Sequence, residues 1–223
     1  VNQISSTLID LPLQGAHTIN GKQAHVYYYI SSPLSLSQRE ALFQLHDLFG
    51  KQVKHSLDLS RVQQMATKDI LTGLGNRAGF EQSMTRQLGW AQRHDEPFAL
   101  LVIDLDNFKY VNDNFGHGEG DKVLAHVASH LSKMLRDEDE AFRYGGDEFC
   151  CLLDCQTQLQ LACAAQRIQS SINSSSYLAG LEVSTSLGGA IYRDGDTMSS
   201  IFDRADNALY RVKNSGKNSY QAA

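Results

Sequence analysis

Two pairs of acidic residues stand where the sequence predicts the ends of strands. Asp104 and Asp106 follow a run of apolar residues, and Asp147 and Glu148 follow two glycines. If the two segments lie side by side in one sheet, at least three carboxylates meet at its edge, and such like charges repel unless a cation neutralises them. Mg²⁺ binds oxygen ligands and is commonly shared between carboxylates and substrate phosphates, and two such ions can activate a hydroxyl and stabilise a leaving oxygen. The pattern predicts a metal-dependent nucleotidyl-transfer site.

Two further features would place phosphates beside these acids. Gly145 and Gly146 allow backbone angles that other residues avoid, and they let a phosphate approach the main chain closely. Lys109 follows Asp104 closely and supplies a positive charge. A glycine pair alone is usually a plain turn, and two aspartates at a strand end are usually structural or solvated. The prediction therefore depends on the combination.

The elements that position these residues alternate between helices and strands from residue 67 onward. Residues 98–103 form a continuous apolar run, which is typical of a central strand buried on both faces. The other predicted strands are 141–144, 149–153, 181–192 and a short edge strand at 219–220. The predicted helices are 76–93, 123–135, 159–172 and 199–213. We expect an α/β or α+β domain with a central sheet flanked by helices.

The segment upstream of this domain has a different character. Residues 26–30 are β-branched and aromatic, which indicates a strand, and Asn20-Gly21 ahead of them is a hairpin-turn signal. Two strands do not form an independently stable domain. We therefore interpret residues 1–35 as a partial upstream β segment of the sensor type, and the start at Val1 as a start partway through a longer protein.

Residues 36–66 are predicted to form a long linker helix. Ser37 and Glu40 have the spacing of a capping box at its start. Apolar residues then recur every three or four positions, at Leu42, Leu45, Phe49, Val53 and Leu57. Such a stripe either forms a coiled-coil seam with a second chain or folds back on its own domain, and the sequence leaves both alternatives open.

The composition limits the classes of partner. The 223 residues include 20 Lys and Arg against 25 Asp and Glu, which gives a net charge of −5. A surface that binds nucleic acid broadly is basic, so this balance argues against one. No apolar run reaches the roughly 18 residues of a membrane span, and no signal-peptide pattern is present. We expect a cytoplasmic protein without a nucleic-acid partner.

Two histidines, His126 and His130, stand one helical turn apart in the predicted helix 123–135. Side chains at this spacing share a helix face, so the two rings could hold one metal ion. The same spacing also describes a solvated or partly packed helix face. The sequence has no HExxH pattern to support the metal.

Residues 143–149, with the sequence RYGGDEF, resemble the signature of the GGDEF family of diguanylate cyclases. Other segments resemble further motifs of that family, in the family's order. These are DILTGLGNR at 69–77, DLDNFK at 104–109, Asn112-Asp113, Gly116-His117, Gly120-Asp121, Ala205-Asp206, Ala208-Leu209-Tyr210 and Lys213 to Asn218. Gly75 departs from a usual proline and Lys217 from a usual arginine. The resemblance predicts a GGDEF domain at residues 67–221.

The resemblance implies a fold and a reaction. The fold would be similar to that of nucleotidyl cyclases and polymerase palm domains. The reaction would be the condensation of two GTP into cyclic di-GMP with release of pyrophosphate. Two Mg²⁺ or Mn²⁺ ions would serve each active site. Because each domain binds one GTP, two domains must face each other, so the resemblance implies a homodimer.

The resemblance also implies roles for individual residues. Metal ligands would be Asp104, the Leu105 carbonyl, Asp147 and Glu148. Catalytic residues would be Asp147, Glu148 and Lys109, with Glu148 as a metal ligand or in activating the 3′-hydroxyl. Asn112 and Asp121 would read the guanine edge, since a carboxylate accepts from guanine N1–H and its exocyclic amine. The other substrate-binding residues would be Phe108, Lys109, Leu71, His117, Gly145, Gly146, Lys213 and Lys217.

A second site is implied at an RxxD motif, Arg136 to Asp139, with five residues between Asp139 and Gly145. Its spacing resembles the inhibitory product site of the family, with Arg167 as a secondary arginine. Residue types alone would describe only a charged helix end.

Three other functions remain to be weighed against an active cyclase regulated by its product and by the upstream segment. They are a catalytically silent receptor for cyclic di-GMP, a cyclase that makes a different cyclic dinucleotide, and a structural dimerisation module built on the linker helix. The intact acidic residues favour the active enzyme.

Overall fold

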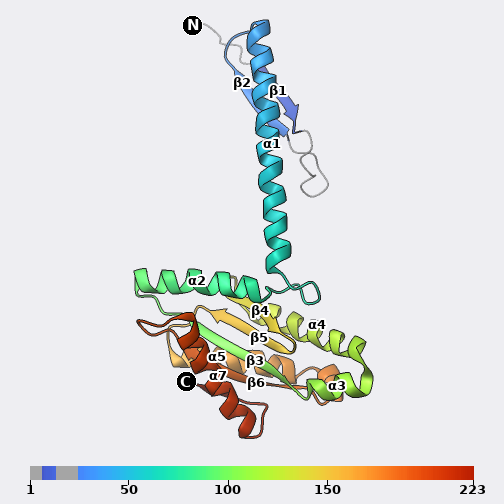
Figure 1. Cartoon of the computed structure of the whole chain (residues 1–223), viewed down its shortest axis with the longest axis vertical. Helices are drawn as coiled ribbons and strands as arrows, with labels where there is room; N and C mark the ends of the chain where they lie inside the picture. The colour runs from blue at the N-terminus through green and yellow to red at the C-terminus, as the bar shows by residue number, and fades with distance from the viewer. Residues whose placement is uncertain (1–6, 14–24) are drawn as a thin grey trace. The chain divides into compact units, whose positions relative to one another are not determined.

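The computed structural model describes residues 7–13 and 25–223, with the backbone alone at 61 and 63–65. It separates into two compact units, residues 1–65 and 66–223, which are described one at a time (Figure 1). The predicted turn at Asn20-Gly21 lies outside the described residues.

The first unit is a β-hairpin beside a long helix. Strand β1 (Thr7–Pro12) pairs antiparallel with β2 (His25–Ile30), and α1 (Leu36–Thr67) follows. The buried ring of His46 joins the three elements, because its Nε2 lies 3.1 Å from the Pro12 carbonyl oxygen and its Nδ1 lies 3.2 Å from the Tyr28 hydroxyl. The hairpin is therefore held to one side of α1.

The predicted capping box at the start of α1 is wrong in position. Ser35 occupies the cap, because its N–H donates to Gln38 Oε1 at 2.9 Å and its Oγ accepts from the Gln38 N–H at 3.3 Å. Ser37, predicted as the cap, lies inside the helix. The spacing of a hydroxyl three residues before Glu or Gln occurs twice here, and spacing alone does not choose between the two.

The second unit is built on a five-stranded sheet. Strand β3 (Ala99–Asp106) lies at its centre between β5 (Glu148–Leu153) and β6 (Ser184–Ile191), and β4 (Glu140–Gly145) and β7 (Tyr220–Ala222) form the edges. All pairings are antiparallel except the parallel pairing of β6 with β7. Every residue of β3 is buried, as its apolar run predicts.

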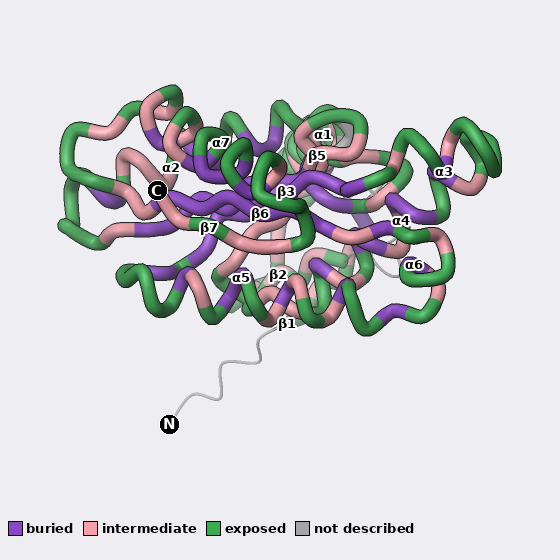
Figure 2. Tube along the Cα trace, turned by 90° about the horizontal axis from the view of Figure 1, so that it is seen from below, coloured by how far each residue is buried: buried purple, intermediate pink, exposed green. Residues whose placement is uncertain are grey.

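Helices cover both faces of this sheet, and Figure 2 shows the buried strands between the two helical layers. One face carries α2 (Arg77–His94) and α7 (Met198–Asn214). The other carries α4 (His117–Met134), α5 (Gln158–Asn173) and the short α6 (Ser176–Gly180). The predicted fold class, a central sheet flanked by helices, is confirmed.

Side chains at the helix starts explain where these helices begin. Asn76 accepts from the Gly79 N–H ahead of α2. Thr157 and Thr197 each form a capping box, with Gln160 ahead of α5 and with Ser200 ahead of α7. These contacts pair backbone N–H groups that would otherwise lack a partner, which fixes the ends of the three helices.

The structure also differs from the predicted elements in three places. Helix α3 (Phe108–Phe115) and α6 were not predicted, because both are short and each buries a single residue. Helix α4 begins six residues before the predicted position 123, at His117. Strand β3 extends through Asp106, so the two aspartates belong to the strand itself.

Among the described residues, none of the helices combines the length and the apolar character needed to cross a bilayer.

Candidate active site

The two acidic segments are adjacent in the sheet. The β3–β5 register places Asp104 opposite Glu148, and the Leu105 N–H donates to the Asp147 carbonyl at 3.3 Å. Asp104, Asp147 and Glu148 therefore stand together at the end of β3 and the start of β5. We call these three residues the carboxylate cluster.

The acids of the carboxylate cluster shift one another's protonation. Burial raises the pKa of Asp104, and the charges of Asp147 and Asp106 raise it further, whereas a bond from Lys213 opposes the shift. Burial also raises the pKa of Glu148, with further increases from Asp104 and Asp147. The cluster thus holds more negative charge than its surroundings neutralise.

One lysine neutralises part of the negative charge of the cluster. Lys213 Nζ, from α7, lies 2.7 Å from Asp104 Oδ2, and both side chains are largely shielded from solvent. The ammonium stands where a bound cation would otherwise neutralise Asp104. The resemblance implied a phosphate contact for Lys213, and in this structure the residue contacts the acid instead.

The chemistry of the cluster fits a hard divalent cation. Carboxylate and carbonyl oxygens are the ligands that Mg²⁺ and Mn²⁺ prefer, and the raised pKa values of Asp104 and Glu148 show charge that a cation would neutralise. Within the described part of the chain, no three His, Cys, Asp or Glu side chains are gathered closely enough to hold an ion. The residues therefore fit the group by type, and Lys213 would have to release Asp104.

The glycine turn between β4 and β5 leaves space above the cluster. Gly146 has φ +44°, a backbone conformation that favours glycine. A Cβ added at Gly145 or at Gly146 would meet nothing within 4 Å. The turn therefore offers main-chain groups in open space beside the carboxylate cluster.

Sequence reasoning missed the arginine that fixes this turn. Arg143 Nε and Nη2 donate to the Gly146 carbonyl at 3.0 and 2.9 Å, and Nη1 lies 3.3 Å from Asp69 Oδ2. Asp69 Oδ1 in turn accepts from the N–H and the hydroxyl of Thr72 at 2.9 and 2.6 Å. The arginine thus links the glycine turn to the loop that carries Leu71. Its place inside the RYGGDEF segment was the available signal.

Burial would raise the pKa of Asp69, but the bonds from Thr72 and the charge of Arg143 outweigh it and lower that pKa. Asp69 is therefore a carboxylate held ionised by its partners, unlike the acids of the cluster. The contrast separates an acid that organises the loop from acids that remain available to a cation.

Asp106, the second aspartate of β3, has a structural environment. Its carboxylate accepts from the Ser184 and Ser186 hydroxyls, both at 2.8 Å, and from the Asn218 N–H at 3.1 Å. It is almost fully buried. These bonds hold the turn after α7 against β3. Lys217, which precedes Asn218 in that turn, reaches Asn107 Oδ1 at 3.3 Å, so it lies beside the end of β3.

The residues predicted to read guanine come together where α3 meets α4. A Cβ at Gly120 would collide with Asn112 Oδ1 and would lie 3.2 Å from Phe108 Cζ. Gly120 therefore permits the close approach of α3 and α4 at Asn112, and Asp121 is the next residue of α4. Asp121 and His117 are exposed.

Two other predicted substrate residues lie at the surface. Leu71 is 37% exposed, in the loop that Asp69 closes, and Lys109 is exposed on the first turn of α3. Both positions allow contact with a ligand from solvent. Neither residue is held in place by the core.

The residues of the predicted inhibitory site lie away from the cluster. Asp139 Oδ2 accepts from the Arg136 N–H at 3.0 Å, and its Oδ1 accepts from the Asp154 N–H at 3.0 Å. Arg136 and Asp139 line a pocket of about 400 Å³. Arg167 is half-buried on α5, with its Nε buried and without a hydrogen-bond partner in the structure. The charges of Arg136 and Arg167 both lower the pKa of Cys155, against the larger effect of burial, which raises it.

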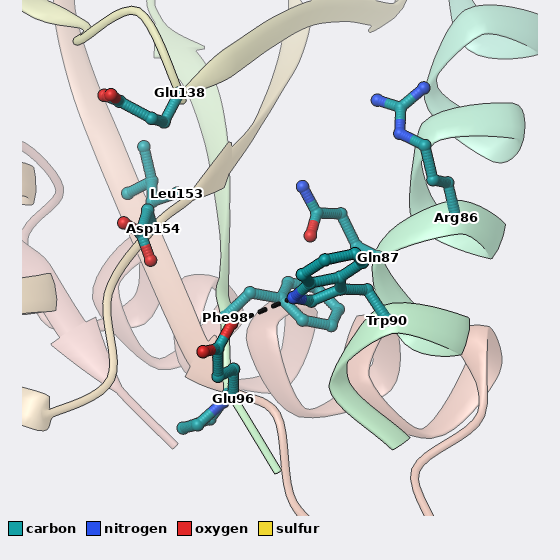
Figure 3. Close-up of a pocket in the computed structure, with 9 residues that line it drawn as sticks. Arg86, Gln87, Trp90, Glu96, Phe98, Glu138, Leu153 and Asp154 are labelled. Atoms are coloured by element: carbon teal, nitrogen blue, oxygen red, sulfur yellow. Dashed lines mark hydrogen bonds between the residues drawn. The ribbon is translucent and has the colours of Figure 1, made fainter. Parts of the chain in front are cut away.

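A second pocket of about 360 Å³ opens at the start of β3, at the opposite end of the strand from the cluster. Figure 3 shows Arg86 and Trp90 on one side and Glu138 and Asp154 on the other. The Trp90 indole N–H donates to Glu96 at 2.9 Å. This pocket flanks the RxxD turn through Glu138 and is separate from the carboxylate cluster.

Comparison with known proteins identifies the family to which these features belong. Residues 66–219 match the family described as "Diguanylate cyclase, GGDEF domain". The diguanylate cyclase DgcS of Shewanella oneidensis is 34% identical over 202 residues, which cover 90% of this chain and 68% of that protein. The diguanylate cyclase DosC of Escherichia coli is 29% identical over 210 residues, and the match spans less than half of its length, 43%.

Solved structures agree with this assignment. The coiled coil and GGDEF domain of DgcB from Caulobacter crescentus, in complex with c-di-GMP, aligns with a TM-score of 0.74 and 30% identity, covering 82% of this chain and 99% of that one. The diguanylate cyclase SiaD from Pseudomonas aeruginosa, in complex with its activator SiaC, aligns with a TM-score of 0.70 and 34% identity, covering 84% and 73%. The paired acids, the glycine turn and these matches together show that the chain belongs to the GGDEF-domain family of diguanylate cyclases.

Proposed function

We propose that this chain condenses two GTP into cyclic di-GMP and pyrophosphate. The observation that carries the proposal is the position of Asp104 opposite Glu148, beside Asp147 and below an open glycine turn. The raised pKa values of Asp104 and Glu148 support it, because burial and nearby carboxylates leave negative charge that a cation would neutralise. Intact acids argue against a silent receptor for cyclic di-GMP.

The cluster would hold Mg²⁺ or Mn²⁺, two ions per site, through Asp104, the Leu105 carbonyl, Asp147 and Glu148. Such ions stabilise charge on phosphates and lower the cost of ionising an attacking hydroxyl. Glu148 would serve as a metal ligand or would take the proton of the 3′-hydroxyl. Lys213 would pass from Asp104 to a phosphate once a cation neutralises the acid.

Substrate recognition would use the junction of α3 and α4. Asn112 and Asp121 offer one amide and one carboxylate to the guanine edge, and Phe108 and Leu71 would line the nucleotide pocket. Lys109, Lys217 and the main chain at Gly145 and Gly146 would meet phosphates. His117, which is exposed at the start of α4, would also contact the substrate.

The reaction needs two copies of the chain, because each domain would bind one GTP. Helix α1 supports a homodimer by its exposed face. Leu45, Leu48, Leu59 and Val62 are each more than half exposed. They lie at the a and d positions of the first and third of three heptads, and Gln52 and His55 lie at those of the second. The predicted stripe divides in the structure, because Leu42, Val53 and Leu57 are instead half-buried. We propose that the exposed face is the seam between two chains.

Product inhibition would use Arg136, Asp139 and Arg167. Asp139 is held in place by two backbone N–H groups, and Arg136 is exposed, so its guanidinium is free to meet a phosphate or a guanine edge. The complex of the related DgcB with c-di-GMP supports a product site in this family.

The test is incubation of the whole chain with GTP and Mg²⁺, with products separated and identified by mass. We expect cyclic di-GMP and pyrophosphate from the unchanged chain and none from Asp147→Asn, which keeps the size of the side chain and removes its charge. Asp137→Asn, at an exposed acid outside the cluster, is the matched control and should remain active. An inactive chain that still binds cyclic di-GMP would favour the receptor instead.

A further inference from the structure

The histidine pair His126 and His130 forms a compact polar site on α4, on the opposite face of the sheet from α7. Their two Nε2 atoms lie 3.2 Å apart, and the ring centroids are 4.9 Å apart. The sequence left open whether these rings share an ion or only occupy a helix face. In the structure, the two Nε2 atoms are within hydrogen-bond distance of each other.

The surroundings hold both rings in place. His130 Nδ1 lies 2.8 Å from the Ser171 hydroxyl on α5, and His126 Nε2 lies 2.9 Å from the Ser175 hydroxyl at the start of α6. The ring of Tyr177 packs edge-on against His126, with centroids 5.0 Å apart. In His130, the ring nitrogen that faces away from the pair is hydrogen-bonded, which is the support that metal-binding histidines commonly have.

The space between the two Nε2 atoms accepts a single cation. If both rings present lone pairs, they repel at this distance, and if one carries a proton, it forms an ordinary N–H···N bond. Two nitrogens bound to one tetrahedral ion at about 2.0–2.1 Å lie roughly 3.3 Å apart. The observed 3.2 Å needs almost no rearrangement to reach that value.

We propose that His126 and His130 bind one first-row transition-metal ion of the Zn²⁺ and Ni²⁺ class, with the Ser175 hydroxyl beside it and water completing the coordination. Imidazole nitrogens suit these ions, whereas Mg²⁺ prefers oxygen. The site is therefore chemically distinct from the carboxylate cluster, and the proposal does not depend on the cyclase activity.

Two features set the expected strength of binding. Burial lowers the pKa of His130, so the ring is neutral near pH 7 and its lone pair is available. Lys133, whose charge also acts on His130, opposes a cation. Within the described part of the chain, no third His, Cys, Asp or Glu gathers with the two histidines, so we expect weaker binding than at a structural zinc site.

The test is calorimetric titration of the whole chain with Zn²⁺, in an Asp104→Asn, Asp147→Asn background that weakens the carboxylate cluster. We expect one bound ion, and an affinity at least about tenfold lower after His126→Gln or His130→Gln. His94→Gln, at an exposed histidine on α2, is the matched control and should bind as the background does. Circular dichroism establishes that each variant is folded.

A third variant separates a supported site from a chance contact. Ser171→Ala removes the partner of His130 Nδ1 without removing a ligand, and it should weaken Zn²⁺ binding by roughly 10- to 100-fold. Titration with Co²⁺ should give an absorption spectrum of nitrogen ligation that disappears in both histidine variants. Absence of Zn²⁺ binding, or equal binding in the background and in folded His126→Gln and His130→Gln, would overturn the proposal, and so would equal loss in His94→Gln.

Discussion

The acids of this domain differ in how far their charge is neutralised. Asp69 and Asp106 have hydrogen-bond donors from several elements, and they organise the loops that surround the site. Asp104 and Glu148 instead have raised pKa values because of burial and of neighbouring carboxylates, Asp147 among them. The same residue type therefore serves two purposes, and the donors around each carboxylate decide which.

The raised pKa values predict how stability depends on pH and on metal. In the folded state, Asp104 and Glu148 hold protons more tightly than in the unfolded chain. The stability this contributes is present below about pH 4 and is lost as the pH rises through the raised folded values. Because Mg²⁺ binds the ionised form, we expect it to raise the unfolding temperature by roughly 5–10 °C near saturation at about pH 8, and by much less at about pH 5.

Differential scanning calorimetry at the two pH values, with and without Mg²⁺, measures this effect. In Asp147→Asn, the loss of one charge should make the metal-free protein more stable at about pH 8 and reduce the response to Mg²⁺. A response to Mg²⁺ that is equal at both pH values and unchanged in Asp147→Asn would contradict the assignment of the cluster as the metal site.

We expect substitution by alanine to have different effects on stability at the two glycines of the turn. A Cβ has open space at both positions, but only Gly146 has a positive φ. Gly146→Ala should therefore reduce the free energy of unfolding by about 1–2 kcal/mol, and Gly145→Ala by clearly less. Urea denaturation measures both, with Gly145→Ala as the matched control. Equal losses would show that the conformation of Gly146 does not require glycine.

At the scale of elements, the sequence predicted the strands of the sheet better than the short helices. The apolar run before Asp104 and the residues around the glycine pair predicted β3, β4 and β5 close to their observed bounds. Helix α3 was missed because its eight residues are mostly polar and only Val111 is buried. The capping box of α1 was misplaced because two hydroxyls have the same spacing to Glu or Gln.

The sequence predicted the acidic residues of the site, but it did not predict the contacts that hold the site in place. The types and spacing of Asp104, Asp147 and Glu148 indicated a cation site before any fold was known. Arg143 bonds to Asp69, 74 residues earlier in the chain, and Asp106 bonds to Asn218, 112 residues later, so no local pattern shows these two contacts. The bond of Lys213 to Asp104 likewise depends on how α7 packs against β3.

If α1 forms the dimer, the activity per chain should depend on protein concentration. Replacing Leu48 and Leu59 with Ser removes two exposed residues of the heptad seam. We expect a weaker dimer and an activity per chain at least about tenfold lower at high dilution, with recovery at high concentration. Leu36→Ser, at an 85% exposed leucine outside the seam, should change neither.

Analytical ultracentrifugation and initial rates over a range of concentrations test this prediction. If the Leu48→Ser, Leu59→Ser chain has the unchanged dimer constant and rate at every concentration, α1 is not the dimerising element.

At the scale of the whole molecule, the carboxylate cluster and the proposed product site lie apart. The carboxylate cluster lies at the end of β3, whereas Arg136 and Asp139 precede β4 and lie near Asp154, which follows β5. Because these sites occupy different ends of the sheet, a variant can change one without touching the other.

Arg136→Ala tests this separation. Loss of a charged donor should raise the concentration of cyclic di-GMP that gives half-inhibition by roughly 10- to 100-fold, with the initial rate unchanged. Arg93→Ala, at an exposed arginine at the end of α2, is the control. Initial rates at increasing product concentration measure both. Inhibition that is identical in the unchanged chain and in Arg136→Ala would remove this residue from the product site.

The central position of β3 also affects how the domain folds. Both strands that pair with β3 come later in the chain, and Asp106 bonds to Ser186, 80 residues further on, and to Asn218, 112 residues further on. Contacts between such distant residues slow folding, because a long loop must close before they form. During synthesis, β3 therefore leaves the ribosome well before any of its sheet partners. The strand that carries Asp104 therefore remains unpaired until β5 and β6 have been synthesised. The site is complete only when the turn after α7 has packed against β3.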